Sequence, residues 1–357
     1  TLPWLAVATA CGGGSGGGVP PVPVRGLYRS ELILPTAGES ALVPSAINAA
    51  GTVAGYMAES EHAPDAVAVR VESGAVQELP VPGNETGFAF GMQAGGPQIV
   101  GEHDRRPRVW GQLTTQQLPV PPGYFSGIAR AVNAGGVIVG TFSDYDDAIP
   151  PEPEGSRPCF WANSAAPVAL LATTPASPLG IAFAINGAGV IAGSIATASG
   201  IMIARWASAA AAVETFPHPP GALASEARAI NDVGDLAGRT GFANGESRGF
   251  ILRAGTAVPS LLPALAAPAP YAEALALNSS GVVVGHSTAA NGERHAVAWN
   301  DSAIVDLNSR LANRDQRIAY LESAVAINEN GQLACYAALG PALAPRTYGL
   351  AILTPQD

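Results

Sequence analysis

The chain has 357 residues, of which 48% are hydrophobic and only 13% are charged. This balance allows a large buried core and excludes a chain that is disordered throughout. The formal net charge of −10 argues against the basic surface that phosphate backbones require, so no nucleic-acid partner is expected. No window holds 18 consecutive apolar residues, which argues against a complete transmembrane helix.

The first segment is apolar and ends in Ala8-Thr9-Ala10, directly before Cys11 and a glycine-serine run at 12–18. It resembles the lipobox of bacterial lipoproteins, in which the cysteine is acylated. The resemblance implies that residues 1–10 end a signal peptide and that 11–26 are an acylated cysteine with a flexible tether. It implies a membrane partner through a lipid anchor and a location at the outer membrane or cell surface. The alternative is an ordinary linker with an incidental cysteine.

After a predicted strand at 27–36, one element recurs seven times: an apolar strand, an Asn-x-x-Gly turn and a second apolar strand. The asparagine side chain can cap the turn, and glycine at the fourth position tolerates positive φ. Gln93 replaces the asparagine in the second copy. The predicted structural turn residues are Asn48, Asn133, Asn186, Asn231, Asn278 and Asn328 with Gly51, Gly96, Gly136, Gly189, Gly234, Gly281 and Gly331.

Two further features recur with each turn. In five copies a second glycine follows four residues after the first. At this position two strands or two neighbouring sheets are expected to approach closely. Cys335 takes this place in the last copy. Four tryptophans occupy equivalent positions in a later strand. They could form a stacking platform, but filling the space between adjacent sheets is favoured. They are Trp110, Trp161, Trp206 and Trp299.

Four short strands in each period of about 45 residues are typical of a β-propeller blade. The predicted fold is therefore all-β: a seven-bladed β-propeller of four-stranded antiparallel blades, closed by the N-terminal strand 27–36, which completes the last blade. Residues 27–357 form this single domain, and a monomer is expected. The repeats span about 45–83, 86–123, 127–175, 179–221, 225–268, 271–320 and 322–355.

The repeat resembles the HAF repeat of bacterial extracellular proteins. The residues that carry the resemblance are HAVAW at 295–299, VDLNSRL at 305–311, VAINENGQL at 325–333 and the terminal YGLAILTP at 348–355. Membership would imply secretion or surface display. It supplies no activity and no catalytic residues.

Variable segments between the second and third strands of each repeat are the expected binding face, because loops on a rigid scaffold commonly carry function. Candidate binding residues there are His62, His103 and Asp104, although solvated surface histidines are the favoured interpretation. The longest segment also carries Asp144, Asp146 and Asp147. These carboxylates are a weak candidate for Ca²⁺, because the segment lacks the glycine and glutamate spacing of an EF-hand.

No other chemistry stands out. Cys159 and Cys335 have no metal-ligand spacing, and buried thiols are favoured over a disulfide. No GxSxG, HExxH or P-loop motif is present, so no catalytic residue and no cofactor are predicted. The leading hypothesis is a non-catalytic binding module with an unknown protein or glycan ligand. The alternatives are a propeller hydrolase or lyase that acts on extracellular polysaccharide, and a purely structural envelope component.

Overall fold

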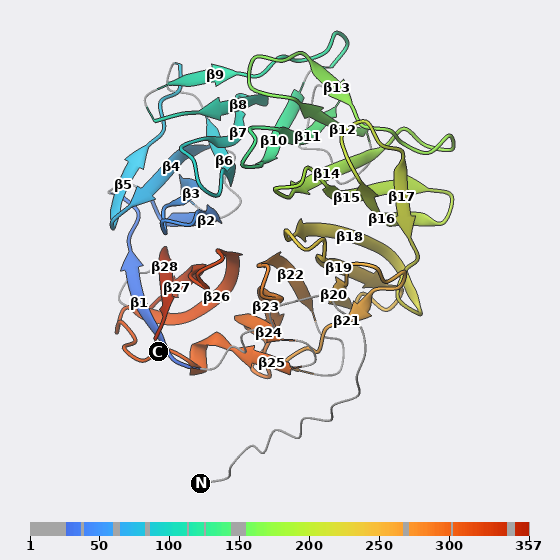
Figure 1. The fold of residues 1–357 in the computed structure, drawn as a ribbon. Helices are drawn as coiled ribbons and strands as arrows, with labels where there is room; N and C mark the ends of the chain where they lie inside the picture. The colour runs from blue at the N-terminus through green and yellow to red at the C-terminus, as the bar shows by residue number, and fades with distance from the viewer. Residues whose placement is uncertain are drawn as a thin grey trace, which may run out of the picture.

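The computed structural model of the protein describes residues 26–36, 39–59, 65–82, 86–112, 114–124, 126–143, 155–266, 271–300, 303–340 and 347–356. In these ranges the chain forms β-strands and one 3-10 turn, η1 (Leu307–Ser309), so the predicted all-β class is confirmed. No helix in the described ranges is long and apolar enough to cross a membrane. Figure 1 shows the sheets side by side around a common centre, which is the arrangement of a β-propeller.

Five sheets contain four strands each, paired antiparallel in chain order as predicted. They are β6 (Gly87–Met92), β7 (Ile99–His103), β8 (Arg106–Trp110) and β9 (Thr115–Gln117); β10 (Ser126–Val132), β11 (Ile138–Ser143), β12 (Ser156–Trp161) and β13 (Val168–Leu170); β14 (Gly180–Ile185), β15 (Ile191–Thr197), β16 (Gly200–Trp206) and β17 (Val213–Phe216); β18 (Ala222–Ile230), β19 (Leu236–Phe242), β20 (Ser247–Leu252) and β21 (Ser260–Leu261); and β22 (Ala272–Leu277), β23 (Val282–Thr288), β24 (Arg294–Asn300) and β25 (Ala303–Asp306).

The remaining sheet has eight strands in two halves that meet at one parallel pair, Ala41 with Tyr348. Strand β1 pairs antiparallel with β28 over its whole length, so the N-terminal strand lies beside the C-terminal one. The halves are β2 (Ala41–Ile47), β3 (Val53–Ala58), β4 (Ala66–Glu72) and β5 (Ala75–Glu78), and β26 (Ile318–Ile327), β27 (Leu333–Leu339), β28 (Tyr348–Pro355) and β1 (Tyr28–Ile33).

In each four-stranded unit one strand lies nearest the centre (Figure 1): β2, β6, β10, β14, β18, β22 or β26. Strand β1 lies at the outside of its unit, where it pairs with β28. The Asn-x-x-Gly turn joins the innermost strand to the second one. We call the end of the units that carries these turns the turn face, and the opposite end the loop face. In the turn at Asn186, the side-chain Oδ1 accepts the amide N–H of Val190 at 2.9 Å, and the amide of Gly189 donates to the Asn186 carbonyl at 3.0 Å.

The turn asparagines also connect neighbouring units. In five of them the side-chain Nδ2 donates to the main-chain oxygen of the next turn asparagine at 2.9–3.5 Å, and Asn328 of the last unit donates to Asn48 of the first. Gln93 donates instead to the carbonyl of Ala134 at 2.9 Å. We call this chain of amide hydrogen bonds the asparagine belt. It links the turns along the turn face, because each amide satisfies one backbone group in its own turn and one in the next.

The second turn departs from the prediction. Its first residue is Gln93, whose amide donates to the carbonyl of Gln98, five residues on, whereas the turn asparagines donate to the carbonyl four residues on. The extra residue moves Gly96 out of the left-handed position that the corresponding glycines occupy, so the positive φ expected there is wrong. It also shifts the second glycine of this copy to Gly101, which the regular spacing misses.

The second glycines lie opposite a β-bulge in each innermost strand. A Cβ atom at any of them would lie only 1.9–2.1 Å from a main-chain oxygen of that strand, so the predicted close approach is present and its cause is the bulge. The six are Gly55, Gly101, Gly140, Gly193, Gly238 and Gly285.

The core fills the space between adjacent sheets. Trp110 is fully buried, and its indole N–H donates to the carbonyl of Pro80, which follows the outer strand of the preceding unit. Trp161, Trp206 and Trp299 repeat this arrangement with Pro119, Ala172 and Pro263. The tryptophans therefore pack between sheets, as favoured from the sequence, and offer no stacking platform. Cys159 and Cys335 are free, buried thiols.

Candidate functional site

One position changes character around the ring. The residue after each second glycine pairs with a residue of the innermost strand, and in the first four units that innermost residue is apolar. In the last three units it is Glu226, Glu273 or Ser323. The pairs are Val43–Tyr56, Phe88–Glu102, Ile128–Thr141, Ile181–Ser194, Glu226–Arg239, Glu273–His286 and Ser323–Tyr336. An apolar residue at this innermost position is enough for packing in four units. The polar residues at the same position in three consecutive units are not needed for packing, and they therefore indicate a function.

Arg239 is the centre of this polar region. Its Nε and Nη2 donate to the two oxygens of Glu226 at 2.9 and 3.4 Å, and its Nη1 donates to Glu273 of the next unit at 3.1 Å. Arg228 donates to the same Glu226 carboxylate at 2.9 Å. Two carboxylates and two guanidinium groups are thus held together at the boundary of β18, β19 and β22.

Tyr271 and His286 extend the region towards the next unit. The Tyr271 hydroxyl donates to Glu273 at 2.7 Å, and the Tyr271 ring stacks on His286 with 5.8 Å between the ring centroids. His286 Nδ1 is hydrogen-bonded to the hydroxyl of Ser323 at 3.2 Å. The other ring nitrogen, Nε2, is buried and has no hydrogen-bond partner among the described residues. An orphaned buried polar atom of this kind is costly unless a water or ligand meets it.

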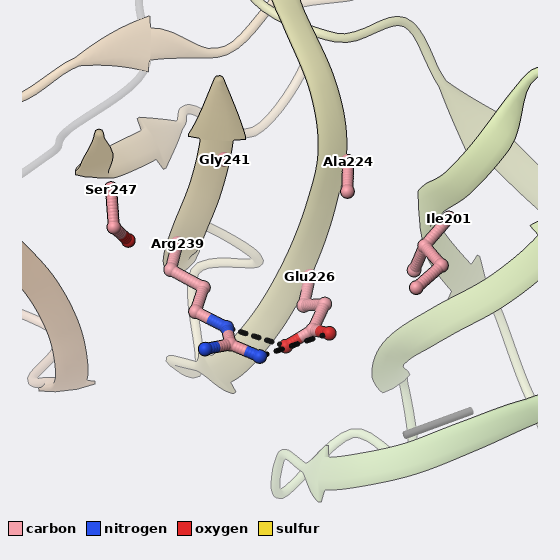
Figure 2. A pocket seen from close by; sticks show the side chains of 6 residues that line it. All are labelled: Ile201, Ala224, Glu226, Arg239, Gly241 and Ser247. Atoms are coloured by element: carbon pink, nitrogen blue, oxygen red, sulfur yellow. Dashed lines mark hydrogen bonds and ion pairs between the residues drawn. The ribbon is translucent and has the colours of Figure 1, made fainter. Parts of the chain in front are cut away.

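A pocket of about 280 Å³ opens over this region. We call it the Arg239 pocket; it is lined by Ile201, Ala224, Glu226, Arg239, Gly241 and Ser247. Figure 2 shows the side chains of Glu226 and Arg239 pointing toward one another from neighbouring strands, with Ser247 and Ile201 on opposite sides. One wall of the pocket is formed by the charged side chains of Glu226 and Arg239, and another by the small apolar surface of Ile201 and Ala224.

The protonation states are set by burial and by these contacts. Burial alone would raise the pKa of Glu273, but Arg239 and the Tyr271 hydroxyl outweigh it, and the pKa is lowered. Burial lowers the pKa of His286 to about 4 against the opposing influence of Glu273. At neutral pH the site therefore presents an ionised Glu273 beside an uncharged imidazole.

The bulge opposite each second glycine, or opposite Cys335 in the last unit, places one residue of the innermost strand outside the regular ladder; β18 and β26 have further bulges. The residues opposite these positions are Ser45, Phe90, Arg130, Phe183, Arg228, Leu275 and Val325. Arg130 and Arg228 lie on the Phe183 ring, with their guanidinium carbons 5.0 and 4.4 Å from its centroid. These cation-π contacts join three neighbouring units through one phenylalanine ring.

Another buried carboxyl group lies outside this polar region. Glu102 in β7 is 7% exposed, and burial raises its pKa to about 7 although Arg130 and Arg105 act to lower it. A carboxyl group with a pKa near neutrality can exchange a proton under physiological conditions. It lies in the second four-stranded unit, away from the units that carry the Arg239 pocket.

The structure changes the interpretation of the predicted loop residues. His103 is the last residue of β7 and is only 3% exposed, so the expectation of a solvated histidine is wrong there; His286 in β23 is likewise buried. The reason is that β7 and β23 run further than expected and end in short turns. Asp104 lies in such a turn with φ 47° and is exposed. His62, Asp144, Asp146, Asp147 and Cys11 lie outside the described residues.

The sequence interpretation missed Glu226, Arg239, Glu273 and Tyr271. A signal for the two glutamates appears only when the repeats are aligned: Glu226 and Glu273 stand in the innermost strand where the first four copies have an apolar residue. Across the described ranges no group of three or more His, Cys, Asp or Glu side chains is arranged to hold a metal ion.

The chain resembles several solved structures in fold. An oligogalacturonate lyase from Vibrio parahaemolyticus superposes with a TM-score of 0.57 at 9% identity, over 92% of this chain and 97% of the lyase. A puromycin hydrolase mutant, S511A, complexed with PGG has a TM-score of 0.55 at 15% identity; 85% of this chain is covered and it spans half of that enzyme. YCF48 bound to D1 peptide has a TM-score of 0.51 at 10% identity, over 95% and 98% of the two chains. Neither a protein-family model nor a curated protein sequence matches the chain.

Proposed function

We propose that this protein is a surface-displayed propeller that acts as a non-catalytic binding module, with the Arg239 pocket as its binding site. The observation that carries the proposal is the set of polar pairs in three consecutive units, of which the pair Glu226–Arg239 lines the pocket; in the other four units the innermost residue of the pair is apolar. Such a site is a concave surface with a few convergent polar groups on rigid strands, which is the usual form of a ligand site.

The ion pairs of the pocket favour binding over catalysis. Glu226 is held by two arginines, and Glu273 is held by Arg239 and Tyr271. The lowered pKa of Glu273 keeps this carboxylate ionised, so it cannot readily take a proton from a substrate. The ion pairs instead provide oriented acceptors and donors before any ligand arrives, which lowers the entropic cost of binding.

The proposal includes the finer architecture. The asparagine belt connects the last unit to the first, and β1 completes the last unit beside β28. Both features support a closed propeller of seven blades. The HAF-repeat resemblance and the lipobox-like sequence at Cys11 support secretion and a lipid anchor at the outer membrane or cell surface.

Binding is tested with the purified full chain and a pocket-filling variant. Ala224→Phe places a ring in the Arg239 pocket without removing an ion pair. Leu223→Phe places the same ring at the neighbouring exposed residue, which does not line the pocket, and is the matched control. Ligands are sought on glycan arrays and by affinity capture from envelope extracts. We expect at least one ligand whose binding is lost in Ala224→Phe and retained in Leu223→Phe. A full search without any ligand would instead favour a structural envelope component.

The lipid anchor has its own test. We expect Cys11→Ala to abolish labelling by a fatty-acid probe and to release the protein from membranes in the producing cell, because the acyl acceptor is lost. A mutant that remains labelled and bound to membranes would contradict the anchor and leave the binding site untouched.

The second candidate is an enzyme that acts on extracellular polysaccharide. Glu102 favours it, because its pKa of about 7 suits a general acid or base. The fold likeness to an oligogalacturonate lyase is compatible with it. The test is incubation with neutral and uronate polysaccharides, followed by measurement of new reducing ends and of unsaturated products. Activity that disappears in Glu102→Gln would establish the enzyme and replace the binding module.

A further inference from the structure

We infer that the Arg239 pocket takes an uncharged, hydroxyl-rich ligand, a neutral glycan, and that Tyr271 provides the surface on which a sugar ring stacks. This inference rests on the proposed binding function and names the ligand class of the same site. Three properties of the site support it: its unused hydrogen-bonding groups, its balance of charge and its exposed aromatic ring.

The first property is a donor beside an acceptor. A guanidinium group has five N–H donors, and Arg239 uses three of them on Glu226 and Glu273. The two others are available in the pocket, where the Arg239 side chain is 34% exposed. The carboxylate of Glu226 has about four acceptor sites, of which Arg239 and Arg228 use three. A hydroxyl group both accepts and donates, so adjacent sugar hydroxyls match this pair of planar side chains.

The second property is the absence of a net charge at the site. Glu226 and Glu273 are balanced by Arg228 and Arg239, which contact them directly. A uronate or phosphate that approached Arg239 would meet both carboxylates at close range, and the chain as a whole carries −10. A neutral ligand avoids this repulsion and still uses the hydrogen bonds.

The third property is the position of Tyr271. Its side chain is 43% exposed although one ring face rests on His286, and its hydroxyl is anchored to Glu273. A parallel bridge pairs Tyr271 with Ser247, which lines the pocket. The contacts with His286 and Glu273 fix the orientation of the ring, and the bridge places the Tyr271 main chain beside a pocket-lining residue; the exposed part of the ring offers apolar surface for the C–H face of a sugar.

The test is titration of the full chain with three polysaccharides by calorimetry. Laminarin is the neutral probe, polygalacturonate is the anionic probe and chitosan oligomers are the cationic probe. We expect binding of neutral sugars only, with an affinity that changes little between low and high salt, because no net charge is neutralised. A glycan array extends the neutral set if laminarin has the wrong linkage.

Variants test the two halves of the site separately. Tyr271→Ala removes the ring and should weaken binding about tenfold. Tyr271→Phe keeps the ring, loses only the bond to Glu273, and should stay within about threefold of the parent. Ala224→Phe should abolish binding while Leu223→Phe should not. Circular dichroism and the denaturation midpoint of each variant show that the fold is retained.

The outcomes separate this inference from the function on which it rests. Preferred binding of polygalacturonate, or neutral binding that Tyr271→Ala and Ala224→Phe leave unchanged, would overturn the inference. Capture of a protein ligand that Ala224→Phe abolishes, with no glycan bound, would overturn the glycan and keep the binding module. Absence of every ligand would overturn both.

Discussion

At the scale of single residues, the second glycines are the least replaceable positions. At Gly193 a Cβ atom would lie 1.9 Å from the carbonyl oxygen of Ile181. Gly193 and Ile181 belong to the paired strands β15 and β14, which cannot move apart without breaking their hydrogen bonds. Gly241, also in a second strand, has no atom within 4 Å of the same virtual position. The same residue type therefore has two different physical roles in equivalent strands.

This contrast gives a first prediction. Gly193→Ala should lower the free energy of unfolding by about 3 kcal/mol, because the collision forces the bulge to rearrange. Gly241→Ala should change it by less than about 0.5 kcal/mol. Urea denaturation followed by tryptophan fluorescence measures both. Equal effects of the two substitutions would show that the close approach to Ile181 is absent in solution.

Two buried titratable residues respond to pH in opposite directions. The folded pKa of His286, about 4, lies below its ordinary value of 6.5, so the unfolded state binds the proton first and stability is lost as pH falls through this window. The folded pKa of Glu102, about 7, lies above its ordinary value of 4.5, so stability is lost as pH rises through that window. Each effect amounts to about 3 kcal/mol.

The second prediction uses one variant for each residue. The difference in unfolding free energy between parent and Glu102→Gln should fall as pH rises from 4.5 to 7. The difference between parent and His286→Gln should fall as pH drops from 6.5 to 4. Chemical denaturation at a series of pH values measures these slopes. Slopes of the same sign for the two variants would contradict the assigned burial of one of them.

At the scale of elements, the Asn-x-x-Gly turn joins local and long-range structure. Asn186 is 5% exposed, accepts the Val190 amide in its own turn and donates to the Asn231 carbonyl in the next. Removing the side chain leaves the Val190 amide without its partner and takes one of two donors from the Asn231 carbonyl, which keeps the Gly234 amide. Asn163, in an exposed turn between outer strands, accepts only the Ala165 amide.

The third prediction compares these two asparagines. Asn186→Ala should cost about 2–3 kcal/mol of unfolding free energy, and Asn163→Ala should cost less than about 1 kcal/mol. Hydrogen exchange should also report faster opening at Val190 in the first variant. If the exposed turn proved as sensitive as the belt position, the hydrogen bonds between units would contribute nothing beyond the turn itself.

At the scale of the whole molecule, β1 brings the two ends of the chain together. It pairs with β28, and its first residue Tyr28 also exchanges main-chain bonds with Arg310 and Ala312. Tyr28 and Ile33 are buried, so the strand contributes apolar packing as well as hydrogen bonds. Without it, β28 would present an unpaired edge.

The fourth prediction is that closure depends on this strand. Deletion of residues 1–33 should lower the unfolding free energy by at least about 3 kcal/mol relative to deletion of residues 1–25. A synthetic peptide of residues 26–36 should restore the loss when added in trans. Identical denaturation midpoints for the two deletions would show that β1 does not hold the ring together.

The sequence by itself determined the all-β class, the four-stranded antiparallel sheets and the inert packing of the tryptophans. These follow from local patterns, because turn residues and apolar strands repeat with a period that each unit carries in full. Only the tertiary structure decided that Glu226, Arg239, Glu273 and Tyr271 form one hydrogen-bonded cluster, of which Glu226 and Arg239 line the pocket. The physical reason is that Arg239 and Glu273 are 34 residues apart and belong to different sheets, so their contact depends on how two units pack. Burial of His103 and His286 was likewise decided by strand length and neighbouring sheets, which no local motif encodes.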